Sequence, residues 1–324
     1  MSKILFISGV SIDKTPVVKY SIKKIYNLNY DIRVIEFKNS RIKFTLLSLF
    51  KVISFRPNFV FFIGLQTLPL LLILQWLPIK KFNWFLESYT KKDNTSFAIR
   101  LLKLEKYIRW NTIIGIFPTK ERIIPYNKFS FKQILILPNA TGLGQIFKPR
   151  RISKHEPVKI CFYGALDENK VYLREFIKFS KEFPDIHLDL YGNNMMIDVS
   201  NEDNINYKGS LPHKELLMVL NQYHFSVIGY KPINFNTKYC APNKLYEALS
   251  LSLPVIVNKN NPTLANFPNI NSFGIIADFD NLDKNLYEKL KNHEDYKKLN
   301  QNAYKQYVER QNLNNYISEL KDLL

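Results

Sequence analysis

The sequence contains few of the residues on which several classes of protein depend. Among its 324 residues are two cysteines, Cys161 and Cys240, too few for a disulfide framework or a cysteine-based metal cluster. All five histidines follow residue 150, and none has the Cys/His spacing that is typical of a zinc site. We therefore expect two reduced thiols in a cytoplasmic protein with no bound metal.

The chain also lacks a hydrophobic run long enough to cross a bilayer. A spanning helix needs about 20 apolar residues, whereas Leu68–Leu77 has ten. This run is either a buried helix or an anchor in the membrane interface, where Trp76 and Lys80–Lys81 would suit the headgroup boundary. Met1 leads directly into the strand-like segment Lys3–Ser8, so we expect no secretory signal peptide.

Acidic residues are scarce in the first half of the chain. Residues 1–150 contain 25 Lys and Arg against 7 Asp and Glu, whereas residues 151–324 contain 21 of each. The whole net charge of +18 therefore lies in the first half. Such a one-sided field favours a polyanionic partner, which is nucleic acid, an anionic membrane surface or a pyrophosphate-linked substrate.

Nucleic acid is the weakest of these three options. Helix-turn-helix, zinc-finger, RRM and KH patterns are absent, and the turn Gly9–Pro16 lacks the G-x-G-x-x-G dinucleotide fingerprint. Part of the excess also has a simpler origin, because an AT-rich genome encodes many lysines. The segment Arg41–Arg56 combines a helical apolar stripe with four cations. It is either a helix that covers a sheet or a helix that lies on a membrane surface.

What the sequence does contain is a regular alternation of apolar strand-like runs and helical segments. Strands are predicted at segments such as Asn58–Ile63 and Val158–Tyr163, and the first strand of each half ends at a glycine. The alternation predicts an α/β fold with two doubly wound, Rossmann-like domains. We place them at 1–150 and 151–324, with the boundary in a polar, helix-poor segment.

The strongest chemical signal lies in residues 235–258. A Pro-Asn pair opens a helical segment there, and Pro254 introduces an apolar strand. In a parallel sheet, such a loop lies at the carboxyl edge, where ligands bind and where the helix start points unpaired N–H groups. Lys244 and Glu247 add a cation and a carboxylate in or just after the first helical turn. A nucleotide-sugar is one ligand that suits this combination.

This stretch resembles the GT-B glycosyltransferases of the family 4 or group 1 type, which are common in bacterial polysaccharide assembly. Their signature, P-x-K-L-Y-E followed after six residues by P-V-I, is matched in order by Pro242, Lys244, Leu245, Tyr246, Glu247, Pro254, Val255 and Ile256. The resemblance implies that Glu247 holds the ribose hydroxyls of a donor nucleotide, with Asn243, Lys244 and Leu245 in the same binding site. The family usually has a second glutamate eight positions earlier, where this chain has Tyr239.

Two glycine turns also resemble the family pattern. Relatives have G-R-L-x-x-x-K-G after the first strand of the second domain, and here Gly164, Leu166 and Lys170 match while Ala165 replaces the arginine. The resemblance implies that Lys170 meets the donor pyrophosphate with the help of helix-start amides. Gly192 occupies the family's next glycine turn. His213 and His224 align to no motif, and we interpret both as structural.

Glu87 is the candidate on the acceptor side. Many relatives have a histidine or an acidic group at the end of the corresponding strand, and the first half of this chain contains no histidine. A carboxylate there orients an acceptor hydroxyl or acts as a base. The alternative is a surface glutamate that caps the following loop. Lys170 is the second catalytic candidate, because a cation stabilises the departing diphosphate.

The resemblance implies a GT-B enzyme with two Rossmann-like domains facing a cleft. The first domain is the acceptor side, the second binds the nucleotide-sugar, and the terminal helix crosses back to the first. The implied activity is a hexosyltransferase-type reaction from a nucleotide diphosphate-sugar to an acceptor hydroxyl, retaining and independent of metal or any other cofactor.

The expected acceptor is a glycan or a lipid-pyrophosphate-linked intermediate of capsule, O-antigen (lipopolysaccharide) or another surface polysaccharide. Peripheral contact with the inner face of the cytoplasmic membrane would suit such an acceptor. Two alternatives stay open. One is a GT-B-type sugar epimerase, which needs its own acid and base residues in the first domain. The other is a nucleotide-sugar-binding protein without transferase activity, which Tyr239 and Ala165 favour.

Overall fold

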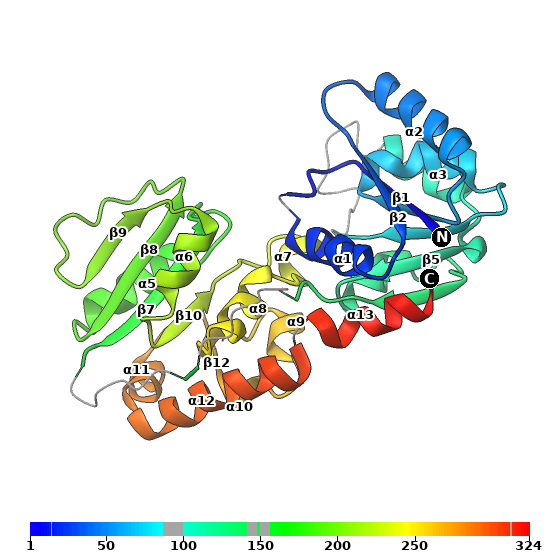
Figure 1. Cartoon of the computed structure of the whole chain (residues 1–324). Helices are drawn as coiled ribbons and strands as arrows, with labels where there is room; N and C mark the ends of the chain where they lie inside the picture. Colours follow the sequence, from blue (N-terminus) through cyan, green and yellow to red (C-terminus); the bar gives the residue numbers. More distant parts are fainter. Residues whose placement is uncertain (14, 87–99, 141–147, 150–155, 312) are drawn as a thin grey trace. The chain divides into compact units, whose positions relative to one another are not determined.

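The computed structural model describes the chain apart from residues 14, 87–99, 141–147, 150–155 and 312. Backbone contacts divide the chain into two compact units (Figure 1). Unit 1 comprises Met1–Gly142 and Leu313–Leu324, and unit 2 comprises Leu143–Asn312. The last helix, α13 (Leu313–Asp322), therefore belongs to unit 1.

Unit 1 contains a six-stranded parallel sheet in the order β2-β1-β3-β4-β5-β6. Its strands are β1 (Lys3–Ser8), β2 (Asp31–Glu36), β3 (Phe59–Ile63), β4 (Lys80–Trp84), β5 (Ile113–Phe117) and β6 (Gln133–Ile136). Every residue of β3 is buried, as expected for a strand with helices on both faces of its sheet. Phe61 of this strand stacks between Phe6 and Phe82, with ring centroids 4.5 and 4.3 Å away.

The helices of unit 1 cover both faces of this sheet. They are α1 (Pro16–Tyr26), α2 (Arg41–Phe55), α3 (Leu68–Leu74) and α13, with short 3-10 turns between β3 and β6. Helix α1 packs beside α13, and α2 packs beside α3 (Figure 1). Because parallel crossovers are right-handed, α1 lies on one face of the sheet and α2 and α3 lie on the other.

The two lysines after α3 are structural. Lys81 is 4% exposed, and its Nζ donates to the backbone oxygens of Leu77 and Ile79 at 2.6 and 2.8 Å. Burial lowers the pKa of this amine. Lys80 Nζ donates to the backbone oxygen of Leu323 at 2.5 Å, which ties the start of β4 to the end of the chain. Both ammonium groups therefore bind protein carbonyls.

Unit 2 contains a second six-stranded parallel sheet, in the order β12-β11-β10-β7-β8-β9. Its strands are β7 (Val158–Ala165), β8 (Ile186–Asn193), β9 (Ile205–Gly209), β10 (Phe225–Ile228), β11 (Val255–Asn258) and β12 (Gly274–Ala277). The chain proceeds outward from β7 to β9 and then returns to the other side of β7 with β10. The strand order thus reverses between β7 and β10, and doubly wound sheets bind ligands outside the carboxyl ends of such strands.

Helices connect these strands as the sequence pattern predicts. They are α5 (Leu173–Glu182), α6 (His213–Leu220), α7 (Phe235–Lys238), α8 (Asn243–Ser250), α9 (Pro262–Ala265), α10 (Ile270–Phe273), α11 (Lys284–Lys291) and α12 (His293–Gln306), followed by a π-helical turn, Tyr307–Gln311. In α5, the residues Leu173, Phe176 and Ile177 share one buried face at helical spacing. The two sheets confirm the predicted α/β class with two doubly wound, Rossmann-like domains. Within the described residues, no helix has the length and apolar character to span a membrane.

Candidate functional site

Two glycines allow the carboxyl ends of β7 and β8 to approach closely. Gly164 has φ +111° and Gly192 has φ +150°, which glycine adopts far more readily than other residues. A Cβ atom on Gly192 would lie 1.7 Å from the backbone oxygen of Gly164. Neither turn therefore accommodates a side chain without rearrangement, and the backbone at the start of the crevice between β7 and β10 stays open.

Lys244 lies directly over the first of these turns. It is the second residue of α8, and a Cβ atom on Gly164 would be 2.6 Å from its Nζ. The same ammonium lies 4.7 Å from the ring centroid of Tyr230 and 5.6 Å from that of Tyr163. In the part of unit 2 that the structure describes, the ion pairs do not include Lys244. Its charge is therefore available to an anion at the strand switch point.

Glu247 lies one turn further along α8 and is 6% exposed. Its Oε1 is 2.9 Å from Nε2 of His213, and its Oε2 accepts a hydrogen bond from the hydroxyl of Tyr163 at 3.3 Å. Burial, and then the charge of Glu247, raise the pKa of Tyr163 well above its usual value. The phenol therefore stays protonated and donates, so the carboxylate is held from both sides.

His213 is the site residue that the sequence interpretation missed. It begins α6, its side chain is 52% exposed, and the hydrogen bond to Glu247 raises its pKa. It matches no motif, but it starts a helix that follows the carboxyl end of β9, and Lys244 likewise lies at a helix start at this edge of the sheet. That shared position was the available signal.

The structure gives Lys170 different surroundings from those of Lys244. Its Nζ lies 2.8 Å from Asp167 Oδ2, its side chain is 66% exposed, and the pairing lowers the pKa of Asp167. Its backbone oxygen accepts a hydrogen bond from the backbone N–H of Lys231 at 2.9 Å, which links the loop after β7 to the loop after β10. The neighbouring cations also have acidic partners, because Arg174 pairs with Glu168 and Lys231 pairs with Glu175.

The remaining predicted site residues fall into three groups. Asn243 is the first residue of α8 and is partly exposed. Leu245 is 1% exposed, so it anchors the helix in the core of unit 2. Glu87 lies outside the described residues.

The segment expected to be a long loop before α8 contains the short helix α7. Asn234 and Thr237 form a reciprocal capping box at its start, in which each side chain accepts a hydrogen bond from the other residue's backbone N–H. Tyr239, at the position of the family's second glutamate, follows this helix and packs against Phe235 with ring centroids 4.7 Å apart. An aromatic ring thus occupies the place where relatives have a carboxylate.

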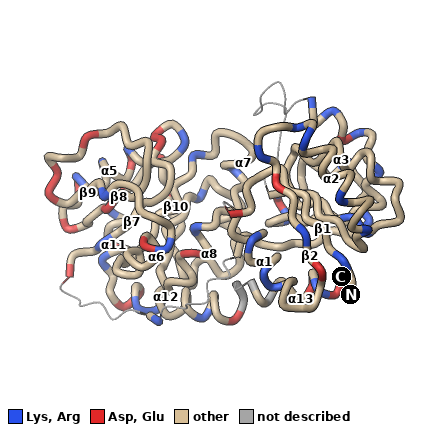
Figure 2. Tube along the Cα trace, turned by 45° about the horizontal axis from the view of Figure 1, so that its top comes forward, with Lys and Arg blue, Asp and Glu red and all other residues tan. Residues whose placement is uncertain are grey.

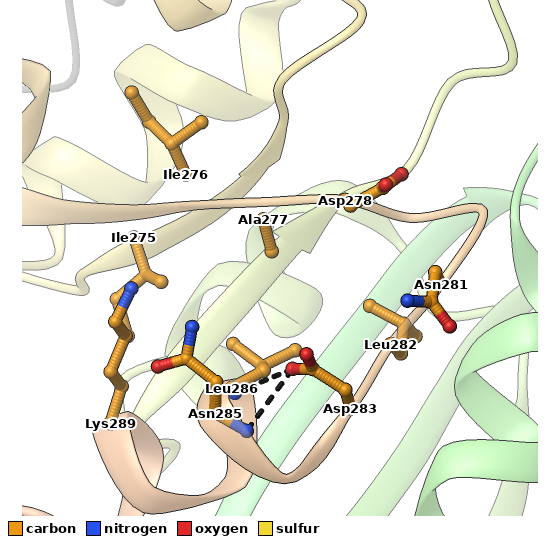
Figure 3. A pocket seen from close by; sticks show the side chains of 10 residues that line it. All are labelled: Ile275, Ile276, Ala277, Asp278, Asn281, Leu282, Asp283, Asn285, Leu286 and Lys289. Atoms are coloured by element: carbon orange, nitrogen blue, oxygen red, sulfur yellow. Dashed lines mark hydrogen bonds between the residues drawn. The ribbon is translucent and has the colours of Figure 1, made fainter.

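A separate hollow of about 210 Å³ lies beside β12 (Figure 3). Asp278 and Asp283 line it, and Asp283 accepts hydrogen bonds from the backbone N–H groups of Asn285 and Leu286 at 3.1 and 3.2 Å. The first turn of α11 is therefore already capped by a carboxylate, which disfavours a phosphate there. In the described residues, no group of three or more His, Cys, Asp and Glu side chains is arranged to hold a metal ion.

The sequence profile of a known family covers all the site residues of unit 2. The profile, glucosyltransferase 3-like, C-terminal domain, matches residues 160–321, which is half of the chain. The chain belongs to the glucosyltransferase 3-like family. A search of curated protein sequences gives no match.

Solved structures share the fold over the whole chain. Sucrose-phosphate synthase from Thermosynechococcus elongatus superposes with a TM-score of 0.76 at 14% identity, covering 100% of this chain and 98% of its own. HepE from Anabaena, in complex with UDP and glucose, gives 0.73 at 9% identity, with coverages of 100% and 99%. The lipopolysaccharide outer core galactosyltransferase WaaB gives 0.71 at 12% identity and covers 100% of both chains.

Identities this low show the fold, and the family profile adds the class of enzyme. Together they confirm that this glucosyltransferase 3-like chain is a glycosyltransferase of the GT-B fold. The family 4 type stays a prediction.

Proposed function

We propose that this glycosyltransferase moves a sugar from a nucleoside diphosphate-sugar, bound by unit 2, to an acceptor hydroxyl. The observation that carries the proposal is the pair of charged residues on α8, with Lys244 over Gly164 and Glu247 buried one turn later. The ammonium and the first N–H groups of α8 suit a diphosphate. The carboxylate suits the hydroxyls of a ribose, because a charged acceptor makes strong hydrogen bonds.

UDP-glucose is the first donor to test. Structures of HepE are in complex with UDP and glucose and with UDP-glucose, and the description of the matched family names a glucosyltransferase. These observations support a uridine nucleotide as the donor of this chain.

We propose that the reaction is retaining and independent of metal. Negative charge develops on the departing diphosphate, and a fixed cation and helix-start amides stabilise such charge without a metal ion. Lys244 supplies the cation at Gly164, and Lys170 adds to it if its pairing with Asp167 opens when the donor binds. Glu87 is the proposed acceptor-side carboxylate. Activity in excess chelator and the anomeric configuration of the product test the two claims.

We propose a lipid-pyrophosphate-linked glycan of surface polysaccharide assembly as the acceptor. The excess of Lys and Arg in the first half of the chain supports an anionic acceptor. A polyprenyl-diphosphate-linked sugar is the probe, and transfer to it that exceeds transfer to the same sugar without the lipid diphosphate supports this assignment.

A thermal-shift screen tests the donor site first. Wild type, Glu247→Gln and the control Glu105→Gln are screened with UDP, GDP, CMP and their sugars, because a ligand that binds the native state raises the unfolding midpoint. Glu105 is a matched control because it is 8% exposed in unit 1 and burial raises its pKa to about 7. We expect one nucleotide to stabilise wild type and the control, and to bind Glu247→Gln about tenfold more weakly or worse. No shift of wild type with any nucleotide contradicts the proposal.

Turnover separates the remaining candidates. The preferred nucleotide-sugar is incubated with water alone and with the polyprenyl-diphosphate-linked sugar. Sugar transfer that requires the acceptor supports the transferase. An isomerised nucleotide-sugar in water indicates an epimerase. Binding without turnover under either condition indicates a binding protein, for which Tyr239 and Ala165, in place of a glutamate and an arginine, are the supporting observations.

A further inference from the structure

Helix α2 exposes a row of large apolar side chains on the side away from the sheet. Ile42, Leu46, Phe50 and Ile53 are 74%, 62%, 62% and 73% exposed. They recur every three or four residues, so they form one stripe along the helix. The residues that face the sheet, among them Phe44 and Phe55, form a second stripe on the opposite side. A helix that only covers a sheet needs the second stripe alone.

The exposed stripe continues beside α3. Ile73, Trp76 and Leu77, in and just after α3, are 52%, 69% and 39% exposed, and α3 packs beside α2 (Figure 1). We define the α2–α3 patch as Ile42, Leu46, Leu47, Phe50, Ile53, Ile73, Trp76 and Leu77. These eight are among 20 exposed large hydrophobic residues in the described chain, so the apolar surface is concentrated here. Such clustering marks an interaction site more often than single exposed side chains do.

The charge around the patch has one sign. Residues 37–86 contain seven Lys and Arg and no Asp or Glu. Arg41 and Lys43 are exposed at the start of α2, and Arg56 is exposed at its end. The guanidinium of Arg109 lies 4.6 Å from the ring centroid of Trp76. Lys and Arg also outnumber Asp and Glu along the trace of unit 1 (Figure 2).

We propose that the α2–α3 patch docks on an anionic lipid bilayer, with α2 lying in the plane of the interface. The apolar stripe enters the boundary between headgroups and acyl chains, while the flanking cations meet lipid phosphates. Trp76 lies at the headgroup level, where an indole is favoured. Lys80 and Lys81 take no part, because both bind backbone carbonyls of the protein.

Charge complementarity selects the bilayer over a second copy of this chain. A two-fold contact through α2 would place the same surface against itself. Arg41, Lys43 and Arg56 would then oppose like charges, with no acidic residue in 37–86 to pair with them. An anionic bilayer provides the opposite charge and an apolar layer together. The inference deepens the proposed membrane-linked acceptor, but it rests on the residues of unit 1 alone.

Vesicle co-sedimentation tests the docking. The full chain is mixed with vesicles of phosphatidylcholine alone or with phosphatidylglycerol, at low and at high ionic strength. The patch variant is Ile42→Ser with Phe50→Ser. The matched control is Ile124→Ser with Met218→Ser, two residues that are 48% and 62% exposed outside the patch. A third variant, Arg41→Gln with Lys43→Gln, tests the cations.

We expect wild type and the control to bind phosphatidylglycerol vesicles, with binding that weakens at high ionic strength. The patch variant should lose more than about tenfold in partition, because it removes two large apolar side chains. The cation variant should bind more weakly and lose most of its salt dependence. Wild type that ignores phosphatidylglycerol vesicles, or equal losses in the patch and control variants, overturns the proposal.

Two further measurements keep the outcomes separate. A wild-type dimer that the patch variant converts to a monomer, without vesicle binding, assigns the patch to a second copy and overturns the proposal. The thermal shift with the donor nucleotide should be the same in wild type and the patch variant, because the substitutions lie in unit 1. A failure of donor binding is thereby distinguished from a failure of membrane docking.

Discussion

Lys244, at the scale of single residues, has the position that best suits the donor diphosphate. We predict that Lys244→Gln weakens nucleotide diphosphate binding by about 10- to 100-fold, because a charge-assisted contact is lost. Stability should change little, since no described carboxylate pairs with this ammonium. Isothermal titration calorimetry measures the affinity. Lys170→Gln is the matched comparison and should have a smaller effect, because Lys170 pairs with Asp167. The reverse ranking would return the main phosphate contact to Lys170.

The pair of His213 and Glu247 makes stability depend on pH. Its hydrogen bond raises the pKa of His213, so the pair contributes fully below the unfolded value, about 6.5, and the contribution is lost as the pH rises through the folded pKa. Because the imidazole is half exposed, we expect less than about 1 kcal/mol. His213→Gln should remove this pH dependence from the unfolding midpoint in the absence of ligand. A midpoint that varies equally with pH in the variant would contradict the assignment.

At the scale of elements, the joined ends of β7 and β8 depend on Gly192. We predict that Gly192→Ala destabilises the protein by roughly 2–4 kcal/mol, because the new Cβ meets the backbone oxygen of Gly164. Gly209→Ala is the matched control, since Gly209 has φ +70° but no atom within 4 Å of the added Cβ. It should cost only about 1 kcal/mol of backbone strain. Urea unfolding measures both, and equal losses would show that the close approach is not the cause.

At the scale of the whole molecule, the end of the chain stabilises its beginning. Leu320 of α13 is fully buried in unit 1, where α13 packs beside α1. We predict that Leu320→Ala destabilises unit 1 by about 2–5 kcal/mol and leaves nucleotide binding by unit 2 intact. Leu290→Ala, at a site that is 2% exposed, should destabilise unit 2 instead.

Hydrogen exchange read by mass spectrometry assigns each loss to its unit. Faster exchange in β1 and α1 for Leu320→Ala, and in β7 and α11 for Leu290→Ala, is the expected result. If both variants accelerate exchange throughout the chain equally, the two units unfold together and the prediction is wrong.

Local patterns in the sequence determined most of the elements. Apolar runs at Lys3–Ser8 and Val158–Tyr163 became β1 and β7, and the Pro-Asn pair set the start of α8. These features depend on neighbours in the chain, so turn residues and hydrophobic periodicity are sufficient to predict them. The alternation of strands and helices likewise determined the fold class, because a strand joined to the next by a helix forms a parallel sheet.

Only the tertiary structure decided which side chains meet. The strand order brings Lys244 over Gly164 and places His213 beside Glu247, 34 residues away in the sequence. Neither contact has a local signature, because both depend on how the carboxyl ends of separate strands are arranged. The two apolar stripes of Arg41–Phe55 are visible in the sequence, but only packing shows which one faces the sheet. The sequence therefore determined the elements, while the packing of distant segments determined the site and the exposed face of α2.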